Sequence, residues 1–357
     1  MISLANLGRQ AGGIGAAVGV LAAGAAVGLA AERYAVGRSF RGTDPLRKEA
    51  FGALRGRVVP LVAADGVALH VEVDELPDAG PLTIVFCHGY CLTQDSWHFQ
   101  RRDLGHLGRL VFYDQRGHGR SAKGDTADAD IATLGDDLCR VIEATAPRGP
   151  VVLVGHSMGG MTVMALAEDH PELFGERIVG VALLSTSPGG LAKVTLGVPA
   201  ALGRVAHRLA PHVLTQLSRK PALVERGWRM GSDLGYVITK RYSYATDVPP
   251  SLVEFTAEMI SSTPIEVISE FFPAFVAHDK LAALPVLDGI ETLVLVGDED
   301  ALTPADHSEA MVEALPSAEL VVIEHAGHLV MLEHPDLVNA HLRALAQRAG
   351  RAVGAGG

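Results

Sequence analysis

One serine in this chain lies where its hydroxyl can act as a nucleophile. Ser157 follows an apolar run that ends in Gly155, and Gly159, Gly160 and a helix-like apolar stretch come after it. A nucleophile on a sharp turn between a buried strand and a helix needs small neighbours, because larger side chains there would collide with the strand or the helix. The first turn of the helix also presents unpaired N–H groups and the positive end of the helix dipole, which favour developing negative charge. The pattern therefore predicts a nucleophilic serine rather than a purely structural turn.

A nucleophilic serine needs a base and an orienting carboxylate, and the chain has candidates for both. In the enzymes that this Gly-x-Ser-x-Gly turn between strand and helix resembles, the acid follows the serine in the chain and the histidine comes last. Asp298 and Asp300 follow one apolar run, and His325 and His328 follow the last one. The order is the expected one, whereas spacing alone leaves the choice within each pair open.

The elements that position these residues read as a mostly parallel sheet. Two β-branched runs around Ala64-Asp65-Gly66 predict an antiparallel hairpin at the start. Further strands are predicted at residues 82–87, 109–114, 151–155, 178–185, 292–297 and 319–324. Near-continuous apolar runs that alternate with helical stretches suit a parallel sheet buried on both faces. We expect an α/β fold with helices on both faces, antiparallel strands at one edge and the reactive residues at the carboxyl ends of the strands.

One long interval interrupts this alternation. Between Ser185 and Glu291 no strand is evident, and the segment reads as helices separated by prolines. It is far too long for an ordinary crossover, so we predict an inserted helical cap whose apolar residues either pack on the core or line an acyl pocket. The predicted division is an apolar N-terminal segment (1–31), a linker (32–56), the first part of the core (57–190), the cap (191–288), the second part of the core (289–350) and a tail (351–357).

The N-terminal segment allows three interpretations. Residues 11–31 contain no charged or polar side chain and are long enough to cross a bilayer, although Ala and Gly are weakly hydrophobic. The segment is a membrane anchor, a cleaved signal peptide, or a soluble apolar helix or disordered tail. Positive residues cluster after the segment, which favours an anchor with the catalytic domain on the cytoplasmic side. The alternatives are a secreted protein and a soluble cytoplasmic one.

Composition excludes several classes of protein. The chain has 357 residues and a formal net charge of −11, and no block of Lys and Arg that would track phosphates, so no nucleic-acid partner is expected. Its three cysteines, Cys87, Cys91 and Cys139, form no CxxC pair. Neither a disulfide framework nor a zinc site is therefore predicted, and we read the cysteines as reduced thiols.

From about residue 57 to residue 345, the chain resembles the α/β-hydrolase superfamily, and within it the serine lipases, esterases and monoacylglycerol lipases. The resemblance rests on four motifs: Gly-His-Ser-Met-Gly-Gly at 155–160, Arg-Gly-His-Gly-Arg-Ser at 116–121, Gly-x-x-Asp at 297–300 and Gly-His at 327–328. It implies a serine rather than an aspartate nucleophile, which separates the chain from the epoxide hydrolases and haloalkane dehalogenases of the same superfamily.

The resemblance also assigns the acid and the base. Asp300 matches the acid of Gly-x-x-Asp, and His328 matches the base of the Gly-His pair. Asp298 then caps the following loop, and His325 packs or forms hydrogen bonds near the site.

An oxyanion hole completes the expected site. One backbone N–H comes from Met158, after the nucleophile. By resemblance to the family's His-Gly motif, the second comes from Tyr90. Gly89 keeps that loop tight, and His88 holds it in place. The block at residues 113–121 carries reactive side chains but has a structural role beside the site in similar proteins.

The expected activity is hydrolysis of a carboxylic ester, with an apolar acyl chain, through an acyl-enzyme on Ser157. No metal and no organic cofactor is expected. Other serine chemistry stays open: thioesterase, carbon–carbon hydrolase, aminopeptidase and cofactor-free perhydrolase or haloperoxidase reactions. A non-catalytic lipid-binding or scaffold protein on this fold is the remaining alternative, and the oligomeric state is left open.

Overall fold

A computed structural model of the chain describes residues 44–76, 80–194, 216, 218–219 and 232–355. The apolar segment at residues 11–31 lies outside this range, so its role as an anchor, signal or tail stays a prediction. Among the residues that the structure describes, no helix is long and apolar enough to span a membrane.

Eight strands of the described chain form one sheet in the order β1-β2-β4-β3-β5-β6-β7-β8. The strands are β1 (Arg57–Val62), β2 (Ala68–Asp74), β3 (Leu82–Cys87), β4 (Gly108–Tyr113), β5 (Val151–His156), β6 (Ile178–Leu184), β7 (Glu291–Gly297) and β8 (Glu319–Ile323). The first two form the predicted hairpin and pair antiparallel at one edge, while β4, β3, β5, β6, β7 and β8 are parallel to one another. The predicted fold class is confirmed.

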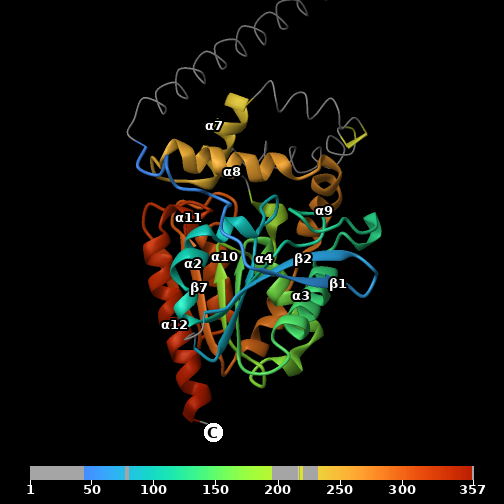
Figure 1. Cartoon of the computed structure of the whole chain (residues 1–357), viewed down its shortest axis with the longest axis vertical. Helices are drawn as coiled ribbons and strands as arrows, with labels where there is room; N and C mark the ends of the chain where they lie inside the picture. Colours follow the sequence, from blue (N-terminus) through green and yellow to red (C-terminus); the bar gives the residue numbers. More distant parts are fainter. Residues whose placement is uncertain (1–43, 77–79, 195–215, 217, 220–231, 356–357) are drawn as a thin grey trace, which may run out of the picture.

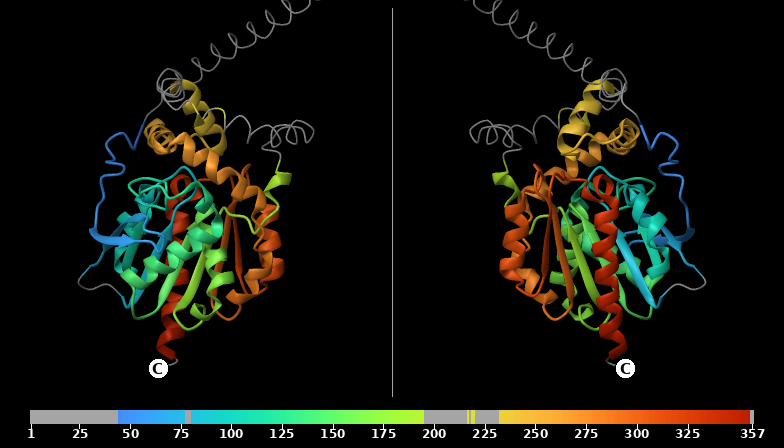
Figure 2. Two further views of the ribbon diagram at one scale, coloured as in Figure 1. Left: turned by 90° about the vertical axis from the view of Figure 1, so that its right-hand side faces the viewer. Right: turned by 90° about the vertical axis from the view of Figure 1, so that its left-hand side faces the viewer.

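Helices cover both faces of this sheet. One face packs against α2 (His98–Asp103), α11 (Val330–Glu333) and α12 (Pro335–Ala355), and the other against α3 (Ile131–Thr145), α4 (Met158–Asp169) and α10 (Ala305–Ala314). Helix α12 lies in front of the sheet in one view of Figure 2 and behind it in the opposite view. Every residue of β3 and β5 is buried, as expected for strands that face an apolar layer on each side.

Three helices lie above the end of the sheet opposite the C-terminus (Figure 1). They are α7 (Ser232–Ser243), α8 (Pro250–Ser262) and α9 (Ile265–Ala277), all within the interval predicted as a cap. Short 3₁₀ helices connect other elements: η1 (Gln94–Trp97), η2 (Gly105–Leu107), η3 (Thr126–Asp128), η4 (Pro171–Leu173), η5 (Leu191–Lys193) and η6 (Leu281–Leu287).

Two predicted boundaries differ from the structure. Leu284 and Leu287 of η6 are buried with α4 and α10 in the core, so the cap ends before the expected residue 288. Helix α12 continues to Ala355, so the expected tail from residue 351 begins inside it. Leu345 and Ala349 of this helix are packed in the core, whereas Arg351 and Ala352 in its last turns are exposed.

Residues 44–56, predicted as linker, instead pack against both the cap and the core. The carboxylate of Asp44 accepts hydrogen bonds from the backbone N–H of Ser251 at 3.1 Å and from its hydroxyl at 3.0 Å, at the start of α8. The ring of Phe51 stacks on Phe255 of α8 with centroids 4.7 Å apart and meets the core residue Phe99 edge-on at 5.9 Å. The aromatic ring at position 51 was the signal that this segment has a buried contact.

Candidate active site

The turn that carries Ser157 has a strained backbone. Ser157 lies between the end of β5 and the start of α4 with φ 53° and ψ −117°, a conformation that costs a non-glycine residue about 1–3 kcal/mol. The surrounding structure holds it there, since its N–H donates to the carbonyl of Leu184 at 3.0 Å and its own carbonyl accepts from the Thr186 hydroxyl at 2.7 Å. The side chain is only half-buried, so the turn presents the hydroxyl at the carboxyl edge of the sheet.

The glycines around Ser157 are required by close backbone contacts. A Cβ at Gly159 would lie 2.0 Å from the carbonyl oxygen of Cys87, at the end of the adjacent strand β3. A Cβ at Gly155 would lie 2.5 Å from the carbonyl oxygen of Gly159. Both distances are far below van der Waals contact, so β5, α4 and β3 can approach one another only with glycine at these positions.

Asp300 and His328 form a buried pair at the same edge. Asp300 Oδ2 lies 2.8 Å from His328 Nδ1, and the two residues are 3% and 6% exposed. The other carboxylate oxygen accepts from the N–H groups of Leu302 at 2.9 Å and Thr303 at 3.0 Å. Burial favours the neutral acid, but the His328 ring and the Thr303 hydrogen bonds outweigh it and lower the pKa of Asp300. The carboxylate therefore stays charged and orients the imidazole through Nδ1.

The other member of each candidate pair lies elsewhere. Asp298 accepts the N–H of Ala326 at 3.2 Å, so it holds the loop that leads to His328. His325 is 78% exposed at its side chain and lies 3.5 Å from the Glu299 carboxylate. The structure thus brings Asp300 and His328 together and leaves His325 in solvent.

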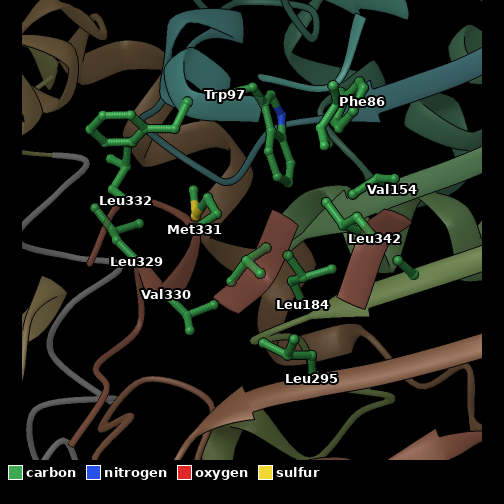
Figure 3. Close-up of a cluster of buried hydrophobic side chains, with 14 of the residues drawn as sticks. Phe86, Trp97, Val154, Leu184, Leu295, Leu329, Val330, Met331, Leu332 and Leu342 are labelled. Carbon is green, nitrogen blue, oxygen red and sulfur yellow. The ribbon is translucent and has the colours of Figure 1, made fainter. Parts of the chain in front are cut away.

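His328 is anchored by its own chain neighbours. Leu329, Val330, Met331 and Leu332 are buried in the core cluster that also contains Trp97 (Figure 3). This packing fixes the backbone that directly follows His328.

His156, which sequence analysis did not single out, joins the base to the nucleophile turn. Its Nε2–H donates to the carbonyl of His328 at 2.9 Å, and the two rings lie 4.8 Å apart. Burial and the charge of His328 lower the pKa of His156 to about 3, so the ring stays neutral. A histidine at the end of an apolar strand, next to the nucleophile, was the available signal. Among the described residues, the Ser157 hydroxyl itself makes no hydrogen bond, and contacts between nucleophile and base commonly tighten only with substrate.

The loop after β3 lies directly against the nucleophile. A Cβ at Gly89 would be 3.2 Å from the Cβ of Ser157 and 2.7 Å from His156 Nδ1. The N–H groups of Tyr90 and Met158 donate no hydrogen bond within the described chain, and as the first residue of α4 Met158 has no partner inside the helix. Met158 directly follows the serine and Tyr90 follows the glycine that lies against it, so these two unpaired donors are the candidates for an oxyanion hole.

His88 ties this loop to the neighbouring one. Its Nε2 accepts the N–H of Gln115 at 2.9 Å, so Nδ1 carries the hydrogen and donates to the carbonyl of Gly89 at 2.7 Å. Burial lowers the pKa of His88 to about 4, and the ring is neutral. Within residues 113–121, Arg116 forms a buried bidentate ion pair with Asp137, both contacts at 2.7 Å, so this loop is held by structural contacts.

Three neutral histidines around the site predict a loss of stability in mild acid. Burial lowers the pKa of His88, His118 and His156 to about 4, 3 and 3, whereas the unfolded chain binds protons on these rings below about pH 6.5. The unfolded state therefore gains protons first as the pH falls, and stability decreases. We expect each ring to cost about 2 kcal/mol between pH 7 and pH 5. Urea unfolding at the two pH values measures this. A wild type whose free energy of unfolding is flat over this range would contradict it, and His118→Gln should lose less stability than the wild type.

The chain belongs to the alpha/beta hydrolase family, whose model matches residues 84–341. A mostly parallel eight-stranded sheet with a serine on the turn after β5 agrees with this assignment.

Three similar proteins are hydrolases of different descriptions. The chain is 28% identical over 251 residues to a 2-hydroxy-6-oxo-6-(2'-aminophenyl)hexa-2,4-dienoic acid hydrolase of Metapseudomonas resinovorans, over 68% of this chain and 75% of that protein. It is 28% identical over 155 residues to a monoacylglycerol lipase of Mycolicibacterium smegmatis, over 42% of this chain and 55% of that protein. A solved thermophilic esterase from Thermogutta terrifontis has a TM-score of 0.63 and 26% identity, and the match covers 84% of this chain and all 100% of the esterase. The protein is a hydrolase, and the comparisons leave the bond that it cleaves open.

Proposed function

We propose that this chain is a serine hydrolase that cleaves carboxylic esters through an acyl-enzyme on Ser157. The observation that carries the proposal is the buried Asp300–His328 pair, 2.8 Å apart, at the sheet edge where a strained turn presents the serine hydroxyl. A serine hydroxyl on an accessible turn, an imidazole held by a carboxylate and two unpaired N–H donors are the parts that acyl transfer needs.

The proposed reaction has two halves. His328 takes the proton of Ser157 as the oxygen attacks the ester carbonyl, and the N–H groups of Tyr90 and Met158 bind the oxygen that becomes negative. His328 then gives its proton to the leaving alcohol, and a water activated by the same ring hydrolyses the acyl-enzyme. Asp300 keeps the imidazole in the required tautomer and stabilises its cation in both halves.

An ester with an apolar acyl chain is the proposed substrate. Apolar residues of the cap, including Phe271 and Phe275 of α9, pack beside the two donor residues Tyr90 and Met158, and the chain resembles lipases and esterases in its nucleophile motif. The comparison with a thermophilic esterase over most of both chains supports the same class.

The test is hydrolysis of p-nitrophenyl esters from acetate to palmitate, together with labelling by a fluorophosphonate probe and mapping of the labelled peptide. We expect turnover, an optimum of acyl length and a probe attached to Ser157. Labelling at Ser157 without turnover of any ester would replace the ester with another acyl compound, such as a thioester or a carbon–carbon substrate. Neither labelling nor turnover would overturn the catalytic assignment and favour a binding protein.

A further inference from the structure

The side chain of Tyr90 reaches from the core to the cap. Its hydroxyl donates to the carbonyl of Ile268 in α9 at 2.5 Å, across 178 residues of sequence. Its ring meets the ring of Phe275, also in α9, edge-on with centroids 4.7 Å apart. Burial raises the pKa of the Tyr90 phenol well above its ordinary value, so the hydroxyl is protonated and can donate at neutral pH. Tyr90 therefore directly follows the glycine that lies against Ser157, and its side chain contacts a helix of the cap.

The second donor residue contacts the same helix. Met158 is fully buried in an apolar cluster that includes Val267 and Phe271 of α9, and Tyr90 and Phe275 pack against that cluster. This cluster is separate from the two clusters that form the sheet core. The side chains of both residues that carry the proposed oxyanion donors are thus packed against α9 as well as against α3 and α4 of the core.

The carbonyl that Tyr90 bonds lies close to a proline inside α9. Pro273 lies inside α9 and has no N–H, so the carbonyl four residues earlier, at Ser269, has no helical partner at that position. Ile268 is the residue next to that carbonyl, and its own carbonyl accepts a bond from outside the helix. The Tyr90 contact therefore lies one residue from the place where the proline interrupts the hydrogen bonding of α9.

We infer that the Tyr90 side chain is a positioning residue that couples the placement of cap helix α9 to the alignment of the oxyanion hole, an inference that rests on the proposed function. When α9 is seated, the hydroxyl bond and the ring contact hold the Tyr90 N–H toward the carbonyl oxygen of the substrate. When α9 shifts, that donor shifts with it. An acyl group that seats the cap correctly then improves catalysis as well as binding.

Tyr90→Phe tests this coupling because it keeps the backbone donor and the ring and removes only the hydroxyl. We expect kcat and kcat/KM for the best p-nitrophenyl ester to fall together by about tenfold with KM unchanged, the signature of a lost transition-state interaction. The loss is smaller than the roughly 10²–10³-fold cost of removing an oxyanion donor altogether, because the N–H remains. Tyr244→Phe is the matched control, since its buried hydroxyl bonds the side chain of Thr256 at 2.6 Å and, within the described chain, makes no bond to α9 or to the loop of Tyr90. Its kcat is expected to stay near that of the wild type.

A second variant changes the cap residue that contacts the Tyr90 ring. Phe275→Leu removes the edge-on ring contact, and we expect a smaller fall in kcat that is not additive with Tyr90→Phe, since both act on one coupling. Three results would overturn the inference: equal kcat values for Tyr90→Phe and Tyr244→Phe, an effect on KM alone, or additive effects in the double variant. In each case, turnover by the wild type would leave the proposed function intact. A wild type that neither turns over esters nor reacts with the fluorophosphonate probe would instead contradict the proposed function itself. Thermal unfolding of each variant shows whether a loss of kcat reflects loss of the fold.

Discussion

Ser157→Ala is expected to lower kcat for ester hydrolysis by about 10⁶-fold with the fold unchanged. Alanine keeps the Cβ at a position with φ 53° and removes only a hydroxyl that makes no hydrogen bond among the described residues, so the strained turn is neither relieved nor further disturbed. The nucleophile is lost outright, and only binding and the oxyanion donors remain to accelerate hydrolysis by water. The measurements are kcat, fluorophosphonate labelling and the thermal unfolding temperature.

Ser185→Ala is a close control for this substitution. Ser185 also has a positive φ, 44°, and it follows β6, the strand next to the one that ends at the nucleophile turn. Its hydroxyl is buried and is not part of the proposed machinery, so we expect activity within a few-fold of the wild type. Full activity in Ser157→Ala, or an equal loss in both variants, would show that the chemistry does not depend on Ser157.

Asp300→Asn is expected to lower kcat by about 10⁴-fold. The amide preserves the shape of the side chain but removes the charge that stabilises the imidazolium, and it places an N–H₂ or a neutral oxygen opposite His328 Nδ1. The present contact of 2.8 Å fixes the tautomer in which Nε2 is free to act as base, and the amide no longer enforces it. Because the carboxylate also accepts from Thr303, a change in kcat should be read beside the free energy of unfolding.

Asp298→Asn provides the paired comparison two residues away. Its carboxylate accepts one backbone N–H, from Ala326 at 3.2 Å, and an asparagine oxygen can accept the same bond. We expect kcat to change by less than about tenfold. If the Asp298 variant lost more activity than the Asp300 variant, the assignment of the acid would be reversed.

The sequence predicted most of the fold because the strands of the sheet correspond to local runs of apolar residues. The six apolar runs and the leading hairpin correspond to strands within one or two residues. The interior strands β3 and β5 are near-continuous apolar runs because both of their faces are buried. The long interval without strands corresponds to a stretch whose described part is helical. Boundaries that depend on packing were less accurate: residues 44–56 dock on α8 through Phe51, and α12 continues beyond residue 350.

The sequence by itself determined which side chains meet at the carboxyl edge, because parallel strands deliver their following residues to the same place. It placed Ser157 on a glycine-lined turn and offered Asp298 or Asp300, and His325 or His328, in the right order. Only the tertiary structure decided that Asp300 faces His328 Nδ1, that His156 holds the His328 carbonyl, and that Tyr90 bonds a cap helix. These contacts join residues far apart in the chain. The geometry of these contacts depends on how loops and helices pack on the sheet, so no local sequence pattern predicts it.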